Sequence, residues 1–180
     1  MPAVKKNRFR QVLQRFFCPA FLVSLYYLVK YRAMVSTKAE VELSLWIRLG
    51  RKTTIGSFTK IKATEGPITI GVRSGIANGC FITASTGGLQ IGNNFICGPN
   101  VVIVGSNHIT EKKGIHLEDQ GHFSKGIRIG DNVWIGANST ILDGSEIGDD
   151  CIVVANSLVN RRFPAGSVIQ GNPAKTIFKR

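Results

Sequence analysis

An aliphatic residue recurs at every sixth position along most of this chain, in series separated by short slips or by one long insertion. Neither the 3.6-residue period of an amphipathic helix nor the two-residue alternation of a half-buried strand gives this spacing. A parallel β-helix does, because each hexapeptide makes a short strand and a turn and points one aliphatic side chain into a narrow interior. The series comprise Leu43, Leu49, Ile55 and Ile61; Ile70, Ile76 and Ile82; Ile91, Cys97, Ile103 and Ile109; and Ile129, Ile135, Ile141, Ile147, Val153 and Val159.

Glycines and small residues keep the same period and suit the turns of such a coil. Glycine commonly follows the aliphatic residue, and the motifs "IGNN", "IGDN" and "IGDD" supply residues that tolerate the positive φ of tight turns. We therefore predict an all-β fold, a parallel β-helix that starts near Val41. Small residues come four positions after the aliphatic one, at places that the repeat assigns to the interior: Thr59, Ser74, Cys80, Ser139, Ser145, Cys151 and Ser157.

One stretch, "GSNHITEKKGIHLEDQGHFSKG", abandons the six-residue period and holds all three histidines, His108, His116 and His122. We expect residues 107–126 to form a polar loop that leaves the β-helix. Imidazole titrates near neutral pH, so a histidine in such a loop suits general acid–base chemistry. A histidine that is hydrogen-bonded for purely structural reasons is the alternative for His108.

The N-terminal segment, residues 1–40, differs in character from the repeats of residues 41–180. An apolar run over residues 16–29 lies between basic flanks. As a helix it would be roughly 21 Å long, short of the roughly 30 Å hydrocarbon core, and Pro19 interrupts it. It has no convincing signal-peptide cleavage site. We expect residues 5–32 to form an amphipathic helical segment at a membrane surface, with packing against the protein as the alternative.

Charge is distributed unevenly along the 180 residues, which include 23 lysines and arginines against 11 carboxylates. Residues 1–65 carry 13 basic and 3 acidic side chains, residues 66–160 carry 5 and 8, and residues 161–180 carry 5 and 0. The basic ends predict anionic partners at two separate places. No nucleic acid is expected, because no zinc-finger spacing, basic heptad or aromatic-rich RNA-binding signature accompanies the charge.

The four cysteines show no CxxC pairing. Cys80, Cys97 and Cys151 fall on interior positions of the repeat, and Cys18 lies in the N-terminal apolar run. We therefore expect reduced core thiols in a cytoplasmic protein rather than disulfides or a metal site.

The motifs "IGNNFICGPNVVI", "IRIGDNVWIGANSTILDGSEIGDDCIVVANSLV" and "GNPAK" resemble those of the hexapeptide-repeat acyltransferases. The similarity is strongest to the branch that holds maltose and galactoside acetyltransferases, virginiamycin-type antibiotic acetyltransferases and polysaccharide O-acetyltransferases, and it covers residues 41–180. The resemblance implies a left-handed β-helix, a homotrimer, acetyl-CoA as donor, and active sites between neighbouring subunits. The N-terminal helical segment is not a general feature of that family.

The resemblance also implies roles for particular residues. "SNH" is similar to the motif of the sugar and antibiotic acetyltransferases, which makes His108, preceded by Asn107, the catalytic general base for a saccharide hydroxyl. The backbone N–H of Ala137 would then stabilise the oxyanion. Trp134 would line the groove for the acceptor and the pantetheine arm, with packing on the outer face as the alternative.

Donor binding is implied along the C-terminal coils. The positions that resemble the family's contacts to the pantetheine arm and the phosphates of coenzyme A are Gly136, Ala137, Ala155, Asn160, Arg161 and Lys175, with Arg162, Lys179 and Arg180 as looser candidates. A solvated basic tail is the alternative for the cations among them.

Together these features favour an acetyl-CoA-dependent O-acetyltransferase, peripheral at the inner face of the cell membrane, that acts on a surface-polysaccharide or lipid-linked glycan precursor. N-acetylation of a nucleotide amino sugar and acetylation of an antibiotic remain variants. A non-catalytic trimeric scaffold and a γ-carbonic-anhydrase-like metalloenzyme are the other classes left open. No metal is expected, because the spacing of His116 and His122 carries no facing information inside a non-repeating loop. Glu118 and Asp119 are candidates for orienting His108.

Overall fold

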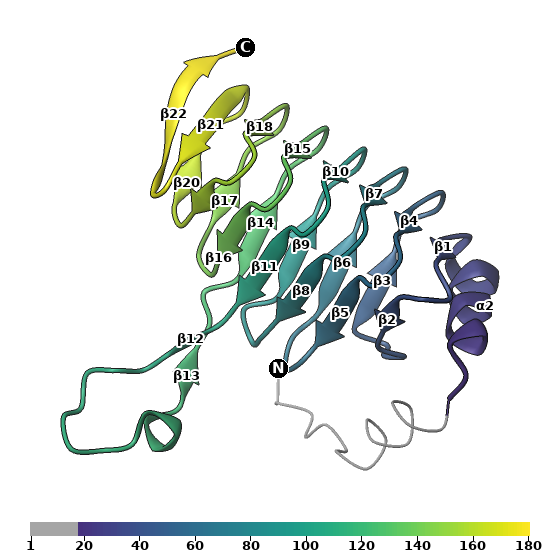
Figure 1. Cartoon of the computed structure of the whole chain (residues 1–180), viewed down its shortest axis with the longest axis horizontal. Coiled ribbons are helices and arrows are strands. Elements are labelled where there is room, and N and C mark those ends of the chain that lie inside the picture. The colour runs from purple at the N-terminus through teal and green to yellow at the C-terminus, as the bar shows by residue number, and fades with distance from the viewer. Residues whose placement is uncertain (1–17) are drawn as a thin grey trace.

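A computed structural model describes residues 18–180, which wind into a left-handed parallel β-helix (Figure 1). Each full coil contributes one short strand to each of three sheets, called A, B and C in chain order. Sheet A contains β1 (Met34–Val35), β4 (Thr54–Ile55), β7 (Gly75–Ile76), β10 (Ile96–Cys97), β15 (Trp134–Ile135), β18 (Ile152–Val153), β21 (Ser167–Gly171) and β22 (Ala174–Lys179). Sheet B contains β2 (Glu40–Val41), β5 (Lys60–Ala63), β8 (Phe81–Ala84), β11 (Val102–Gly105), β16 (Thr140–Leu142) and β19 (Leu158–Val159). Sheet C contains β3 (Ile47–Leu49), β6 (Ile68–Ile70), β9 (Leu89–Ile91), β14 (Ile127–Ile129), β17 (Glu146–Ile147) and β20 (Arg162–Phe163).

Stacked aliphatic side chains fill the interior at the predicted six-residue spacing. In sheet B, Ile61 pairs with Ile82, Ile82 with Ile103, and Ile103 with Ile141, and all four side chains are fully buried. Burial of one such side chain contributes about 1.5–3 kcal/mol, so this stack is a main source of stability. The small residues predicted for the interior are buried as well, namely Thr59, Ser74, Cys80, Ser139, Ser145, Cys151 and Ser157.

All interruptions of the six-residue period fall at one corner, between sheets B and C. The two slips follow Ala63 and Ala84, which pair with each other, and the long insertion follows Gly105, which pairs with Ala84. The interior admits only small residues here, since these positions are buried alanine or glycine. Leu43 takes the equivalent place in the first coil and is 36% exposed, so its prediction as an interior residue was wrong.

The long insertion forms the predicted loop. Its root is a two-stranded antiparallel ribbon of β12 (Asn107–His108) and β13 (His122–Phe123), and a 3₁₀ turn, Leu117–Gln120, comes just before β13. The loop projects away from the body of the β-helix (Figure 1). Ile109 belongs to this loop and is only partly buried, so it does not continue the interior series as predicted.

The two ends of the β-helix are built differently. At the N-terminal end, helix α2 (Ala20–Tyr31) begins directly after Pro19 and packs on β1 and β3. Its buried residues are Val23 and Tyr27, and the Tyr27 hydroxyl donates a hydrogen bond to the carbonyl of Glu42 at 2.7 Å. At the C-terminal end β22 folds back antiparallel onto β21. Strand β1 lies before Val41, so the β-helix starts one strand earlier than the repeats indicated.

Candidate active site

His108 lies on β12 at the root of the loop. The antiparallel register places it directly opposite His122, so both imidazole rings project from the same face of the ribbon. His108, His122 and Asn107 are all exposed. The sequence suggested that His122 lies further out in the loop, whereas the fold returns it to the side of His108. His116 does lie further out, directly before the 3₁₀ turn.

A carboxylate that the sequence analysis missed lies beside these histidines. Nε2 of His122 is 2.7 Å from Oε2 of Glu65, which also accepts a hydrogen bond from the hydroxyl of Ser85 at 3.0 Å. Glu65 and Ser85 belong to earlier coils at the corner from which the loop leaves. Only the stacking of coils reveals this proximity, since no local pattern links residues so far apart in the chain. Glu118 and Asp119, the candidates named from sequence, are part of the 3₁₀ turn instead.

Asp143 fastens the loop to the β-helix. Its buried carboxylate accepts hydrogen bonds from the backbone N–H of Lys125 at 2.7 Å and of Gly126 at 2.8 Å. The hydroxyl of Ser124 joins the two ends of the loop by donating to the carbonyl of Gly105 at 2.6 Å. Bonds to an ionised acceptor are among the stronger hydrogen bonds in proteins, so the root of the loop is well fixed.

Side chains cap backbone N–H groups from one coil to the next at two corners of the β-helix. Between sheets C and A, Asp131 Oδ1 accepts from the N–H of Asn93 and Asp149 Oδ1 from that of Asp131, both at 2.7 Å. Between sheets A and B, Asn78 Oδ1 accepts from the N–H of Ser57 at 2.9 Å. These caps satisfy donors that would otherwise lack a partner within the chain.

The caps are missing at Ala137 and Ala155. These residues occupy equivalent positions on adjacent coils at the corner between sheets A and B, where an alanine side chain offers no acceptor. Within residues 18–180, neither of their backbone N–H groups has a hydrogen-bond partner. The N–H of Gly136, by contrast, already donates to the carbonyl of Val153 at 2.7 Å, and a Cβ on Gly136 would lie 2.4 Å from Ala155 N. Ala137 and Ala155 therefore offer fixed, free donors, while Gly136 serves close packing of the coils.

Trp134 lies on the outer face of sheet A, just before this corner. Its indole is 52% exposed, and its neighbours across the sheet are Ile96 and Ile152. The described part of its own chain therefore leaves about half of the side chain free to contact a ligand or another subunit.

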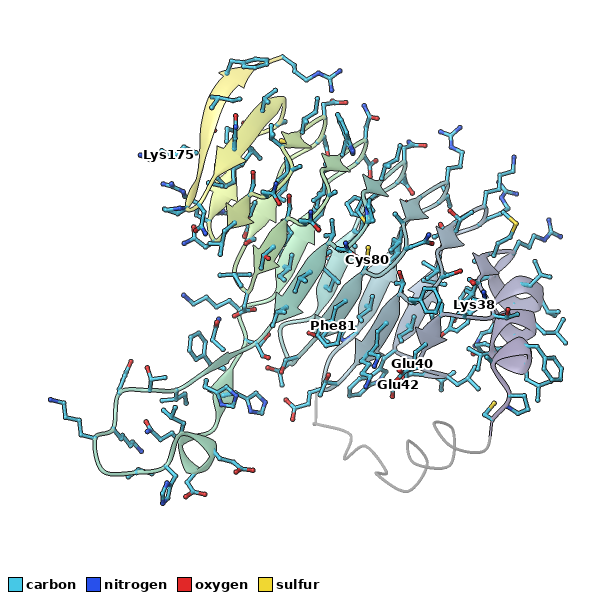
Figure 2. All side chains as sticks on the ribbon, viewed as in Figure 1. Lys38, Glu40, Glu42, Cys80, Phe81 and Lys175 are labelled. Carbon is cyan, nitrogen blue, oxygen red and sulfur yellow. The ribbon has the colours of Figure 1, made fainter. Side chains whose placement is uncertain are left out.

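Two of the predicted phosphate-binding cations lie together at the C-terminal end. The guanidinium of Arg161 donates to the carbonyl of Ala174 at 2.7 Å, which brings it next to Lys175, and it lies 5.8 Å from the ring centre of Phe163. Lys175 projects from β22 away from the β-helix (Figure 2). Asn160 is exposed directly before Arg161.

The looser candidates are placed less favourably for the same ligand. Nε of Arg162 donates to Oε2 of Glu146 at 2.7 Å, so this cation is engaged on the outer face of sheet C. Lys179 and Arg180 lie at the far end of β22, where the N–H of Arg180 donates to the carbonyl of Gly166.

The coils align the residues predicted to bind coenzyme A along one corner of the β-helix, and His108 lies at another corner. Ala137, Ala155 and the hairpin turn between Gly171 and Ala174 follow one another coil by coil, because β15, β18 and β21 pair in parallel. We call these three places the donor column; neighbouring strands are roughly 4.8 Å apart. His108 follows β11, at the opposite end of the sheet B strands. Within one chain, His108 and the donor column thus stand at different corners.

A shallow hollow of about 500 Å³ lies on the outer face of sheet C, away from the donor column. A smaller hollow of about 200 Å³ continues it to the root of the loop at Lys125 and Gly126. Both are lined in part by the polar side chains of Gln90, Arg128 and Glu146. The smaller hollow, next to the loop, is the more polar of the two.

In residues 18–180, no group of three or more histidine, cysteine, aspartate or glutamate side chains is arranged to hold a metal ion. Cys80, Cys97 and Cys151 are free and buried, as predicted for core thiols. The sulfur atoms of Cys80 and Cys97 are 3.8 Å apart in the interior, where Figure 2 labels Cys80. The hydrogen bond with Cys80 and burial both raise the pKa of Cys97, which keeps this thiol protonated and unreactive.

These features define a class of protein, the parallel β-helices built from hexapeptide repeats with a histidine-bearing loop. The family model "Bacterial transferase hexapeptide (six repeats)" matches residues 126–161. A galactoside O-acetyltransferase of Escherichia coli (strain K12) is 35% identical over 49% of this chain and 43% of that protein. A "Probable acetyltransferase" of Mycobacterium tuberculosis is 27% identical over 79% of this chain and 45% of its own length.

Among solved structures, a mutant of AntD, an N-acyltransferase from Bacillus cereus in complex with dTDP and coenzyme A, has the same fold. It matches with a TM-score of 0.75 and 19% identity over 87% of this chain and 88% of that chain. The chain thus carries bacterial transferase hexapeptide repeats and is similar to hexapeptide-repeat acetyltransferases. It spans about half the length of the curated relatives it matches.

Proposed function

We propose that this chain is an acetyl-CoA-dependent O-acetyltransferase whose acceptor is a saccharide hydroxyl. The observation that carries the proposal is the donor column, where the uncapped N–H groups of Ala137 and Ala155 lead to the cations Arg161 and Lys175. Free backbone donors suit the carbonyl groups of a pantetheine arm, and neighbouring cations suit its phosphates. The coenzyme A in the AntD structure and the sugar acceptor in the name of the E. coli relative support the two halves of the proposal.

In the proposed reaction His108 is the general base. Its imidazole removes the proton of the acceptor hydroxyl while the hydroxyl oxygen attacks the thioester carbonyl carbon. The carbonyl oxygen becomes an oxyanion, and the N–H of Ala137 donates a hydrogen bond to it. When the carbon–sulfur bond breaks, the imidazolium returns its proton to the leaving thiolate. A general base contributes on the order of 10²–10⁴ in rate, and one oxyanion donor on the order of 10²–10³.

A homotrimer completes the active site in this proposal. Because His108 and the donor column stand at different corners of one chain, a neighbouring copy must bring its donor column to the loop. The outer face of sheet B carries an apolar pair that could take part in such a contact, since Phe81 is exposed and pairs with Val102. Exposed apolar strips of this kind commonly mark contacts between proteins.

We further propose that the acceptor is a surface-polysaccharide or lipid-linked glycan precursor, met at the inner face of the cell membrane. The exposed apolar residues of α2 support this, while residues 5–17 of the predicted amphipathic segment lie outside the described residues. No helix within residues 18–180 has the length and apolar character needed to span a membrane. The polar hollow on sheet C beside the loop offers hydrogen-bonding side chains for a sugar.

Calorimetric titration with acetyl-CoA tests the donor site without knowledge of the acceptor. We expect one site per chain, an affinity about tenfold lower in Lys175→Ala through the loss of one charge-assisted phosphate contact, and unchanged affinity in His108→Ala. Lys112→Ala removes the same charge from the loop and is the matched control, expected to bind as the wild type does. Absence of binding at millimolar ligand by a folded oligomer would overturn the proposal and favour a non-catalytic scaffold.

A further inference from the structure

The N-terminal end of the β-helix presents an apolar helix face to solvent. Helix α2 covers that end of the coil (Figure 1) and turns Val23 and Tyr27 inward. Phe21, Leu25 and Leu28 lie on the opposite face of the helix at i, i+4 and i+7, and each is about half exposed. Together with β1 this face forms an open groove of about 370 Å³, lined by Phe21, Ser24, Leu25, Leu28, Met34 and Val35.

Cations replace the usual turn residues at the corner next to this groove. Between sheets C and A, a residue with positive φ recurs from coil to coil, and in the later coils it is Asn94, Asn132, Asp150 or Gly166. Asparagine and aspartate tolerate this backbone conformation better than other side chains do. In the first coils the same place holds Arg32, Lys52 and Arg73, with φ of 53°, 62° and 55°. These three residues, here called the cation column, place positive charge where the later coils have neutral or acidic residues.

The cation column lies directly beside the apolar groove. The N–H of Lys52 donates to the carbonyl of Arg32 at 3.0 Å, so these two corner residues are stacked on adjacent coils. Arg32 also ends α2, and Met34 of the groove comes two residues later on β1. Cationic heads and apolar side chains therefore share one end of the molecule.

No carboxylate neutralises the cation column within residues 18–180. The ion pairs there are made by Glu40, Glu65 and Glu146 with partners outside the column. Residues 1–65 contain only 3 acidic side chains against 13 basic ones. A surface that is both apolar and uncompensated in charge is complementary to a bilayer with anionic headgroups, where side chains of each kind find their own environment.

We propose that this end of the β-helix docks on an anionic lipid bilayer, with the cation column at the lipid phosphates and the groove of α2 and β1 at the acyl boundary. The inference rests on the proposed function for its purpose, since it would bring the enzyme to a lipid-linked acceptor. Three coil spacings, roughly 15 Å, separate β2 from β11, so His108 stands clear of the headgroups at the height of a sugar carried on a lipid.

Sedimentation with vesicles tests the docking surface. The probes are phosphatidylcholine vesicles with about one quarter phosphatidylglycerol and vesicles of phosphatidylcholine alone. The variant Arg32→Asn/Lys52→Asn/Arg73→Asn installs the residue that later coils use at this place, so we expect it to fold. We expect its affinity for the anionic vesicles to fall roughly 100-fold, from the attraction that each basic residue contributes near such a surface. Lys112→Asn/Lys113→Asn/Arg128→Asn removes equal charge elsewhere and should bind as the wild type does.

An equal loss of vesicle affinity in both triple variants would overturn the proposal, because net charge alone would then explain the binding. No loss of affinity in the first variant would also overturn it, because the cation column would then have no part in docking. Leu25→Gln/Leu28→Gln tests the groove independently, and unchanged vesicle binding in that variant would remove the apolar half of the surface. Acetyl-CoA titration of the same proteins separates the two proposals. A variant that still binds acetyl-CoA but no longer binds vesicles supports the docking surface. Wild-type protein that binds vesicles but not acetyl-CoA refutes the proposed enzyme activity and leaves the docking surface standing.

Discussion

Replacing Ala155 with asparagine would place an acceptor next to the free N–H of Ala137. At the neighbouring corner, Asp149 caps the N–H of Asp131 in the coil before it. Asp131 and Asp149 are as far apart in the chain as Ala137 and Ala155. There is room for the new side chain, because a glycine lies beside each position. Gly136 lies against residue 155 as Gly130 lies against the existing cap, Asp149. A Cβ on Gly130 would lie 2.2 Å from Asp149 Oδ1, so glycine is what lets the cap approach.

Two opposite effects follow from the cap in Ala155→Asn. A side-chain cap on an otherwise free N–H contributes about 1 kcal/mol, so the free energy of unfolding should stay the same or rise by that amount. The donor substrate meanwhile loses a backbone hydrogen bond and meets a side chain in its path, so the affinity for acetyl-CoA should fall at least about tenfold. Stability and donor binding therefore change in opposite directions.

Thermal unfolding and calorimetry measure both quantities on the same protein. The matched control is Asp149→Ala, which removes the existing cap at the other corner and should lose about 1 kcal/mol of stability while binding acetyl-CoA normally. Wild-type affinity in Ala155→Asn, at unchanged stability, would refute the argument that the free N–H of Ala137 belongs to the donor site.

Three further changes test the loop and the N-terminal end. Asp143→Ala should accelerate hydrogen exchange at the loop root roughly 100-fold, equivalent to about 3 kcal/mol of lost hydrogen bonding, while the free energy of unfolding of the β-helix changes little. A large change in that free energy would contradict a role confined to the loop. Glu65→Gln keeps a hydrogen-bonding group beside His122 but removes its charge, so it should alter the pH profile of acetyl transfer more than the affinity for acetyl-CoA; an unchanged profile would make the contact incidental. Tyr27→Phe should cost about 1–2 kcal/mol in chemical denaturation by removing the hydrogen bond that the Tyr27 hydroxyl donates to the carbonyl of Glu42, and unchanged acetyl-CoA affinity would separate this effect from the active site.

The six-residue period predicted the β-helix because one residue in six meets the same interior environment in every coil. Ile55, Ile76 and Ile135 are buried for that reason. The prediction was wrong at Leu43 and Ile109 because period alone does not report how wide each corner is or where the chain leaves the coil. The slips after Ile61 and Ile82 did carry that information, since they mark the corner from which the loop departs.

The candidate site was only partly predictable. Motifs indicated His108, Ala137 and Lys175, whose roles stay predictions until donor binding is measured. The contact between Glu65 and His122 could not be read from sequence, because it depends on which coils meet at a corner and how the loop folds back. The missing caps were also invisible, since an alanine signals a free N–H only once its neighbour in the next coil is known.

Helix α2 and strand β22 have a consequence for how the molecules behave in concentrated solution. A stack of parallel strands ends in rows of unpaired backbone groups, and such rows pair readily with those of another molecule to build fibres. Here α2 lies across the first coil at one end, and β22 runs antiparallel over the last strand of sheet A at the other. A variant without α2 would expose the first coil, and we expect it to polymerise end to end rather than simply to unfold.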